Sequence, residues 1–375
     1  MIKVASHSII TPLGYSADEC FSAMCEGRSG LRQGLTPFAS TEPFCASMFA
    51  SHDFSGLSAP RLSNDATPLE RLAVAAVSAA LKESPSTDPA STSTIFILST
   101  TKGNIELMAD APHDQRIRLS HSAEVIARAF GNRNQPLVVS NACISGVAAQ
   151  TAASRLLKSG AFDTAIIVGA ELISRFIVAG FQSFKALSSE PCRPFDASRC
   201  GLNLGEGAGV LILTTRDSDS EWVLHNCAIA NDANHISGPS RTGEGSYRVL
   251  SRVARDIDSA DIAFINAHGT ATPYNDEMES IAITRAGLAG VPVNSLKGFL
   301  GHTLGAAGVI ETIISMLAVK KGIILPTPGY ENCGTSRPLS VSDTMRPTDR
   351  RIFIKLISGF GGVNGAIAYE RRLSQ

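Results

Sequence analysis

One cysteine and two histidines in this sequence lie next to apolar runs of the kind that form buried strands. Cys143 follows residues 137–139, His268 follows residues 262–266, and His302 precedes a helix-forming stretch of small residues. A cysteine thiolate is a nucleophile that can hold an acyl group. Two neutral imidazoles can each donate an N–H to one carbonyl oxygen and so stabilise an enolate as it forms. The three residue types together suit decarboxylative carbon–carbon bond formation.

Each of these residues also has a purely structural interpretation. A small buried cysteine often only fills space, and a histidine beyond a strand is often a hydrogen-bonded core or loop residue. Cys143 lies at the turn between a strand and a helical run that continues as far as Lys158. Unpaired N–H groups and the helix dipole favour an anion at such a place. We therefore expect this position to lower the pKa of the Cys143 thiol.

Apolar runs alternate with helical patterns along the chain. Runs without polar alternation predict strands that are covered on both faces. The pattern predicts an α/β protein rich in parallel strands. We expect strands at 2–14, 94–99, 137–139, 164–169, 210–213, 262–266, 292–295, 352–357 and 366–369. We expect helices at 17–26, 68–83, 121–130, 275–287 and 304–321, and a further helix that follows the turn at Cys143 and continues as far as Lys158.

Two helical stretches resemble each other across the chain. An offset of 162 residues aligns Cys143-Ile144-Ser145-Gly146-Val147 with Gly305-Ala306-Ala307-Gly308-Val309. The same offset aligns Lys158 with Lys320 and Gly160 with Gly322. Coincidence is the alternative, because each match is weak alone. A true repeat predicts two related βα halves, 1–220 with the cysteine and 221–375 with both histidines. The two helix starts then meet near the centre of the protein.

Composition narrows the possible functions. The chain has 375 residues, is 44% hydrophobic and carries a net charge of −1, which indicates a large core and gives no case for binding nucleic acid or an anionic membrane. Its eight cysteines are scattered, without a CxxC pair or zinc spacing, so we expect no disulfide scaffold, no metal site and a reducing cytoplasm. No run approaches the roughly 18 to 20 apolar residues of a membrane span, and residues 1–10 lack a signal-peptide core.

The order and spacing of the motifs resemble those of the β-ketoacyl-acyl-carrier-protein synthases, the elongating condensing enzymes of the Cys-His-His type. The resemblance covers nearly the whole chain and implies a thiolase-like fold, in which two similar βα halves pack as a five-layered α-β-α-β-α core. The motifs are Thr11-Pro12-Leu13-Gly14, Cys143, Gly180-Phe181 with Ala186-Leu187-Ser188, Arg193-Pro194-Phe195-Asp196, Gly205-Glu206-Gly207-Ala208-Gly209, His268-Gly269-Thr270-Ala271-Thr272-Pro273 with Asp276, Lys297-Gly298 with Gly301-His302, and Gly359-Phe360-Gly361-Gly362-Val363-Asn364-Gly365.

The resemblance implies a 3-oxoacyl-[acyl-carrier-protein] synthase of fatty acid, polyketide or aryl-polyene synthesis. In that family Cys143 would take the acyl chain, and His268 and His302 would stabilise the enolate that malonyl-carrier protein gives when it loses CO2. Thr270 and Thr272 would bind the phosphopantetheine arm. The substrates would arrive on acyl carrier protein, so no cofactor of the enzyme itself is implied.

The resemblance also implies supporting roles. Lys297 and Glu311 would form a buried pair that orients the His302 loop. The backbone N–H groups of Cys143 and Phe360 would form the oxyanion hole, and the Phe360 ring would act as a gate over Cys143, with plain packing as the alternative. The protein would form a homodimer, or a heterodimer with a related synthase-like subunit.

Three positions depart from the family pattern. Ile144 stands where a small residue is usual, Cys200 where an acidic residue is usual, and Leu202 where an aromatic residue is common. These changes bear on acyl specificity rather than on the reaction class. The 100–104 segment and the short chain resemble the synthases of the aryl-polyene and flexirubin pigment pathways.

Two other functions compete with an active synthase. A catalytically silent partner of the chain-length-factor type usually lacks the nucleophilic cysteine, which is present here as Cys143. A thiolase normally carries a second cysteine near its C-terminal glycine motif, and residues 358–362 contain none. The initiating synthases use Cys-His-Asn, which His302 disfavours.

Overall fold

The computed structural model describes residues 1–38, 42–60, 62–217 and 219–372. The helices that the sequence predicts lie close to their expected places, from the capped start of the second helix at Thr67 to the long helix near the end, whereas the helices at 175–183, 244–253 and 297–300 were not predicted. The helices are α1 Ala17–Cys25, α2 Pro68–Lys82, α3 Leu119–Ala129, α4 Ser145–Lys158, α5 Arg175–Ser183, α6 Glu244–Val253, α7 Pro273–Arg285, α8 Lys297–Leu300 and α9 Ala307–Lys320.

Most strands belong to one large sheet, with two small sheets beside it. The large sheet has the order β13-β11-β10-β15-β16-β9-β1-β8-β6-β4-β5. The strands are β1 Lys3–Ile10, β2 Arg32–Leu35, β3 Phe44–Ser47, β4 Thr94–Ser99, β5 Leu137–Val139, β6 Thr164–Glu171, β7 Leu204–Gly205, β8 Gly207–Thr214, β9 Trp222–Asn231, β10 Ile262–Asn266, β11 Pro292–Asn294, β12 Ile323–Ile324, β13 Ser340–Val341, β14 Arg346–Pro347, β15 Ile352–Gly359 and β16 Val363–Arg371.

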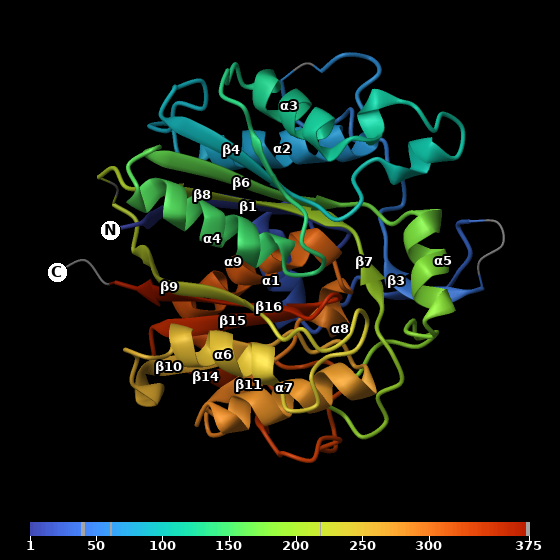
Figure 1. Ribbon diagram of the computed structural model, residues 1–375, viewed down its shortest axis with the longest axis vertical. Coiled ribbons are helices and arrows are strands. Elements are labelled where there is room, and N and C mark those ends of the chain that lie inside the picture. Colours follow the sequence, from blue (N-terminus) through green and yellow to red (C-terminus); the bar gives the residue numbers. More distant parts are fainter. Residues whose placement is uncertain (39–41, 61, 218, 373–375) are drawn as a thin grey trace.

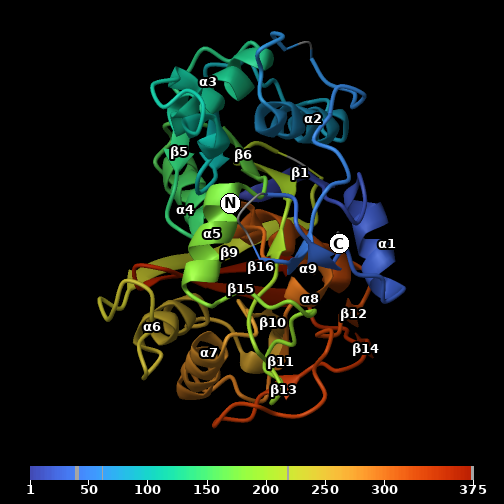
Figure 2. The same cartoon turned by 90° about the vertical axis from the view of Figure 1, so that its right-hand side faces the viewer.

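Five layers result, as the resemblance implied (Figure 1). Helices α2 and α3 cover the outer face of the first half of the sheet, and α6 and α7 cover the outer face of the second half (Figures 1 and 2). Helices α1, α4 and α9 fill the layer between them. Helix α9 is buried on all sides up to its last residue, because both sheet halves enclose it. Within the described chain, no helix has the length and apolarity needed to cross a membrane.

The sheet is mixed, so the prediction of mainly parallel strands was only half right. The order β1-β8-β6-β4-β5 in the first half repeats as β9-β16-β15-β10-β11 in the second half. In each half the outer pairs are parallel, whereas β8 and β16 are antiparallel to both of their neighbours. Only a short turn joins β15 to β16, and such a turn reverses the strand direction.

Helices α4 and α9 meet at the centre through two glycines. The sequence alignment places Gly146 over Gly308, and in the structure these residues face each other. A Cβ atom at Gly146 would lie 2.8 Å from the Gly308 Cα atom, and a Cβ atom at Gly308 would lie 2.5 Å from the Val147 nitrogen. The two equivalent helices therefore approach each other at equivalent positions, and this contact brings the start of each helix to the same place.

We expect Gly146→Ala to destabilise the protein by about 1 to 3 kcal/mol, because the added methyl group meets backbone atoms that cannot move aside cheaply. Urea unfolding of the purified variant measures this loss. Gly180→Ala is the matched control: Gly180 also lies within a helix, but a Cβ atom there would have no neighbour within 4 Å. If both variants are as stable as the unmodified protein, the close approach of α4 and α9 is not real.

Candidate active site

A strained elbow presents Cys143 between β5 and α4. Ala142 adopts a positive φ of 46°, which turns the chain sharply before the cysteine. The Ser145 hydroxyl accepts a hydrogen bond from the Asn141 N–H at 2.8 Å and donates one to the Ala142 carbonyl oxygen at 2.6 Å. The first residue of α4 thus fixes the elbow that carries the thiol.

The side chains of Cys143, His268 and His302 converge on one point. One sulfur or ring-nitrogen atom from each residue lies within 4.8 Å of the other two, and all three residues are buried. The two imidazole centroids are 4.9 Å apart, with the rings inclined at 79°. Among the described residues, nothing bonds to His268 Nδ1 or to either ring nitrogen of His302. The ring nitrogen of each histidine that lies near the sulfur can therefore bind a substrate oxygen placed there.

Both imidazoles are neutral. Burial, followed by the positive charge of Lys297, brings the pKa of His268 and of His302 well below its ordinary value, and Lys355 adds to the effect on each. A neutral imidazole has one N–H donor and one acceptor nitrogen. The pair can thus offer two donors to a developing oxyanion without first losing a proton.

The predicted lowering of the Cys143 pKa was wrong. Burial raises the pKa of the Cys143 thiol to about 12, although Lys297 and the backbone N–H groups of Cys143 and Phe360 oppose this shift. Loss of water around the sulfur outweighs the favourable field at the start of the helix. The resting group is a thiol. The same two N–H groups interact with the sulfur, and their role as an oxyanion hole stays a prediction.

The His268 loop follows β10 and is held by carboxylates on α7. Glu279 accepts the N–H groups of His268 and Gly269, each at 2.7 Å. The Thr270 and Thr272 hydroxyls lie 2.9 Å apart and both line the cavity that leads to the cysteine. The two threonines are therefore placed where a substrate arm would pass.

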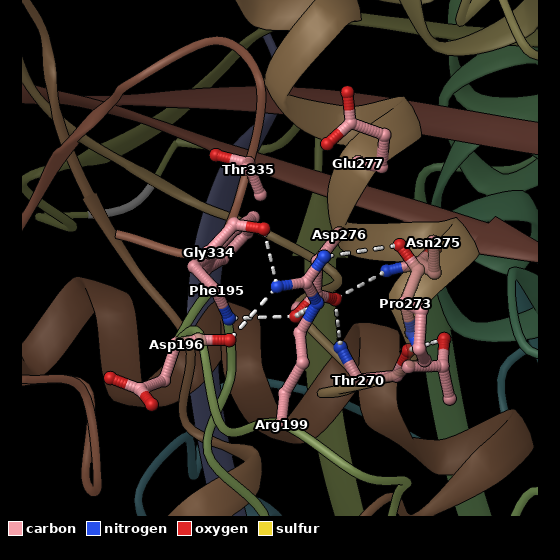
Figure 3. Close-up of polar contacts among 12 residues, drawn as sticks. Phe195, Asp196, Arg199, Thr270, Pro273, Asn275, Asp276, Glu277, Gly334 and Thr335 are labelled. Carbon is pink, nitrogen blue, oxygen red and sulfur yellow. Dashed lines mark hydrogen bonds and ion pairs between the residues drawn. The ribbon is translucent and has the colours of Figure 1, made fainter. Parts of the chain in front are cut away.

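A second set of contacts ties the Thr270 loop to the 193–199 segment (Figure 3). Asp276 accepts the N–H of Thr270 at 3.1 Å and that of Phe195 at 2.7 Å. Arg199 lies 4.0 Å from this carboxylate and donates to the Gly334 carbonyl oxygen at 2.6 Å. The Arg-Pro-Phe-Asp motif is thus tied to the histidine loop through Phe195 and Asp276.

The His302 loop packs against the start of β7. The His302 N–H donates to the Asn203 carbonyl oxygen at 2.7 Å, and the Gly205 N–H donates to the His302 carbonyl oxygen at 3.0 Å. Gly301 has a φ of +67°, and a Cβ atom on it would lie 2.1 Å from the Leu204 carbonyl oxygen. Only glycine fits this close approach.

Lys297 and Glu311 are in contact, with their charged atoms 2.5 Å apart and both side chains buried. The structure adds a residue that the sequence reasoning missed. The ammonium group of Lys355 lies 2.5 Å from the other oxygen of Glu311. The signal in the sequence was a single lysine inside the apolar run 352–357.

A mainly apolar cavity of about 580 Å³ opens above Cys143. Leu202 lines it and packs in the same hydrophobic cluster as Cys143, and Cys200 lies exposed at its edge. Ile144 points elsewhere: it is fully enclosed in the central core between the sheet halves. The interpretation of Ile144 as a residue that shapes the acyl site is therefore not supported, whereas Leu202 is well placed.

Phe360 covers the cavity from the β15–β16 turn. Its ring is 39% exposed and lies 5.8 Å from the Phe181 ring and 5.5 Å from the Phe184 ring, between centroids. Gly361 and Gly362 follow with positive φ values of 86° and 72°. The ring thus packs against two other aromatic rings of the cavity, and its role as a gate stays a prediction.

Comparisons with known proteins identify the family. Sequence models described as "Beta-ketoacyl synthase, N-terminal domain" and "Beta-ketoacyl synthase, C-terminal domain" match residues 1–219 and 222–331. A 3-oxoacyl-[acyl-carrier-protein] synthase 2 of Rhizobium meliloti (strain 1021) is 28% identical, over 99% of this chain and 98% of that protein. The synthase 2 of Vibrio harveyi is 33% identical, over 64% of this chain and 63% of its own length.

Solved structures agree. The ishigamide ketosynthase/chain length factor is 27% identical, with a TM-score of 0.89 and 99% of both chains covered. A Xenorhabdus doucetiae ketosynthase in complex with its chain length factor has a TM-score of 0.86 at 24% identity, over 99% of this chain and 98% of that chain, and supports the fold alone. The chain belongs to the β-ketoacyl synthase family, a family of acyltransferases that act in fatty acid or polyketide synthesis.

Proposed function

We propose that this protein elongates an acyl chain held on Cys143, using malonyl-acyl-carrier protein as the source of two carbons. The observation that carries this proposal is the meeting of one thiol and two neutral imidazoles within 4.8 Å at the end of an apolar cavity. In the first step the Cys143 sulfur attacks the thioester carbonyl of an acyl carrier. A new C–S bond forms, and the carrier thiol leaves with the proton of the cysteine.

The second step uses the histidines. Thr270 and Thr272 bind the phosphopantetheine arm of the malonyl carrier, and its thioester oxygen accepts hydrogen bonds from His268 and His302. The malonyl carboxylate then leaves as CO2, and its bonding electrons form the enolate. The enolate carbon attacks the acyl group on Cys143, the C–S bond breaks and the sulfur leaves as a thiolate. The 3-oxoacyl carrier departs, and the thiolate takes up a proton from water to restore the thiol.

The two halves, 1–220 and 221–375, contribute different parts of this site. The first half supplies the nucleophile, and the second half supplies both enolate-stabilising histidines. The intact Cys-His-His set disfavours a silent chain-length-factor-like role, and the described turn 359–362 has no cysteine that would favour a thiolase.

Acyl carrier protein is the proposed partner for both substrates. We also propose that the chain works as a dimer, either with a second copy or with a synthase-like subunit. The second arrangement is that of the Xenorhabdus doucetiae ketosynthase in complex with its chain length factor. All eight cysteines are free, which fits the cytoplasm. The pigment-type aryl-polyene pathway is the proposed setting, on the resemblance of the 100–104 segment and the short chain.

Reconstitution tests the proposed function. The protein is incubated with one acyl carrier and with malonyl carrier, and the carrier-bound product is analysed by mass spectrometry. A 3-oxoacyl product that is two carbons longer supports the proposal. Release of CO2 without chain extension, or no reaction with any acyl carrier of a broad panel, contradicts it.

We expect Leu202→Phe to shift the acyl preference toward shorter chains, by about tenfold in relative rate, because the larger ring fills cavity volume next to Cys143. Competition between acyl carriers of increasing chain length measures the preference. Ile144→Val is the control, since Ile144 packs in the core and not in the cavity. An unchanged preference in the Leu202 variant would show that the acyl chain lies elsewhere.

A further inference from the structure

A second buried lysine lies behind the two histidines, and the steps above do not use it. Lys355 is in the middle of β15, and its side chain has no exposure to solvent. Its ammonium group donates to Glu311 at 2.5 Å and to the Asn266 side-chain oxygen at 2.7 Å. It also donates to the Ala267 carbonyl oxygen at 3.0 Å. The Asn266 carbonyl oxygen is more distant, at 3.4 Å, and the three shorter contacts match the three donors of an ammonium group.

Glu311 is shared between two cations. One of its oxygens contacts Lys297 and the other contacts Lys355, each at 2.5 Å. Burial alone would raise the pKa of Glu311, but Lys297 and Lys355 together hold it below its ordinary value, so the carboxylate is ionised. One lysine would already balance this charge. A second buried cation is costly unless other groups stabilise it. Here those groups are the acceptors of Asn266, at the end of β10, and of Ala267, directly after it.

Lys355 also holds one end of the peptide group that leads into His268. The Ala267 carbonyl oxygen accepts from Lys355, and the N–H of the same peptide group donates to Glu279 at 2.7 Å. A cation at the oxygen and a carboxylate at the hydrogen match the polarity of the peptide dipole. Charge-assisted hydrogen bonds of this kind are shorter and stronger than neutral ones. They fix the backbone directly before the catalytic imidazole.

We propose that Lys355 is a positioning residue for the decarboxylation step, because it joins the His268 loop through Glu311 to Lys297 and so to the His302 loop. The proposal rests on the condensing function proposed above. Lys355 touches no substrate. It sets the spacing of the two imidazoles and adds a positive charge behind them, where that charge favours neutral histidines and an anionic enolate.

Burial lowers the pKa of Lys355 to about 8 against the opposing charge of Glu311, so below that pH its ammonium group is charged and gives the proposal a signature in the acidic range. Lys355 lowers the pKa of both imidazoles, so its removal raises both pKa values. The histidines then become protonated at a higher pH, and the acidic limb of the plot of decarboxylation rate against pH moves to higher pH. Other charged or titratable groups face the imidazoles or their loops and remain unchanged in the variant: Cys143 on the elbow, Arg199 before β7, Asp276 and Glu279 on α7, Lys297 on α8 and Glu311 on α9.

The test is Lys355→Met, which keeps the length of the side chain and removes its charge and donors. We expect the kcat of malonyl-carrier decarboxylation to fall by about 10- to 100-fold, with the acidic limb shifted upward, while acyl transfer to Cys143 stays within about threefold of the unmodified rate. Lys355→Arg keeps the charge, so its acidic limb should not move. Lys320→Met is the matched control, because Lys320 lies at the exposed end of α9 and pairs with Glu221.

Equal decarboxylation rates and equal pH profiles in Lys355→Met and the unmodified protein would overturn the proposal. If the methionine variant does not fold, the arginine variant decides: acylation retained with an unmoved acidic limb supports the proposal, and loss of both steps together shows a merely structural residue. If the unmodified protein itself neither takes an acyl chain nor decarboxylates malonyl carrier, it is the proposed function that fails, and the role of Lys355 falls with it.

Discussion

Cys143→Ala is expected to lower the rate of 3-oxoacyl product formation by at least about 10³-fold. Removal of a covalent nucleophile generally has an effect of this size or larger, and no sulfur remains to hold the acyl chain beside the histidines. The substitution removes one buried atom from a cluster of small and apolar side chains, so the fold should survive. Carrier-bound products are measured by mass spectrometry with acyl and malonyl carriers both present.

Cys20→Ala is the matched control for this loss. Cys20 is also buried, and burial likewise raises the pKa of its thiol, to about 11, but it lies on α1 and outside the cavity. We expect this variant to form product at the unmodified rate. Product formation by Cys143→Ala at a comparable rate would remove Cys143 from the reaction and with it the covalent mechanism.

His268→Ala and His302→Ala are each expected to slow malonyl decarboxylation by about 10²- to 10³-fold, the usual effect of removing one donor to a developing oxyanion. Acyl transfer to Cys143 should change much less, because the backbone N–H groups of Cys143 and Phe360 are proposed to stabilise that transition state. Release of CO2 and the mass of the protein measure the two steps separately.

The control for the histidine variants is His225→Ala, which removes a half-buried histidine of β9 that does not line the cavity. Unfolding in urea shows whether each variant is intact. If a folded His302→Ala protein decarboxylates malonyl carrier as fast as the unmodified protein, the two-histidine enolate site is wrong. If both steps fall equally in a folded variant, that histidine does not act on the second step alone.

Much of the fold was predictable because apolar runs and helical patterns in the local sequence indicate where strands and helices form. The aligned stretches that contain Gly146 and Gly308 became the two central helices, and most of the apolar runs became strands. Helix α5 was not predicted, since only Ile177 and Val178 are buried in it and little of its apolar face packs on the core. Helix α6 was also missed, because it begins at a glycine in a left-handed conformation without a side-chain cap.

Only the residues of the site that belong to sequence motifs were predictable. The sequence placed Cys143, His268 and His302 in loops beyond strand ends, and the structure brings them together. The sequence did not show that burial would dominate the pKa of Cys143, because that burial comes from segments far apart in the chain. It also did not show Lys355, since its partners Asn266 and Glu311 lie on elements distant in sequence, and a lone lysine in a strand gives no sign of its neighbours.

Acylation of the unmodified protein tests the central claim most directly. The protein is incubated with a panel of acyl carriers, its intact mass is recorded, and the modified peptide is then mapped. We predict one added acyl group on Cys143, and its disappearance with formation of the 3-oxoacyl carrier once malonyl carrier is added. An unmodified Cys143 with every acyl carrier, or an acyl group mapped to a different residue, would contradict the account.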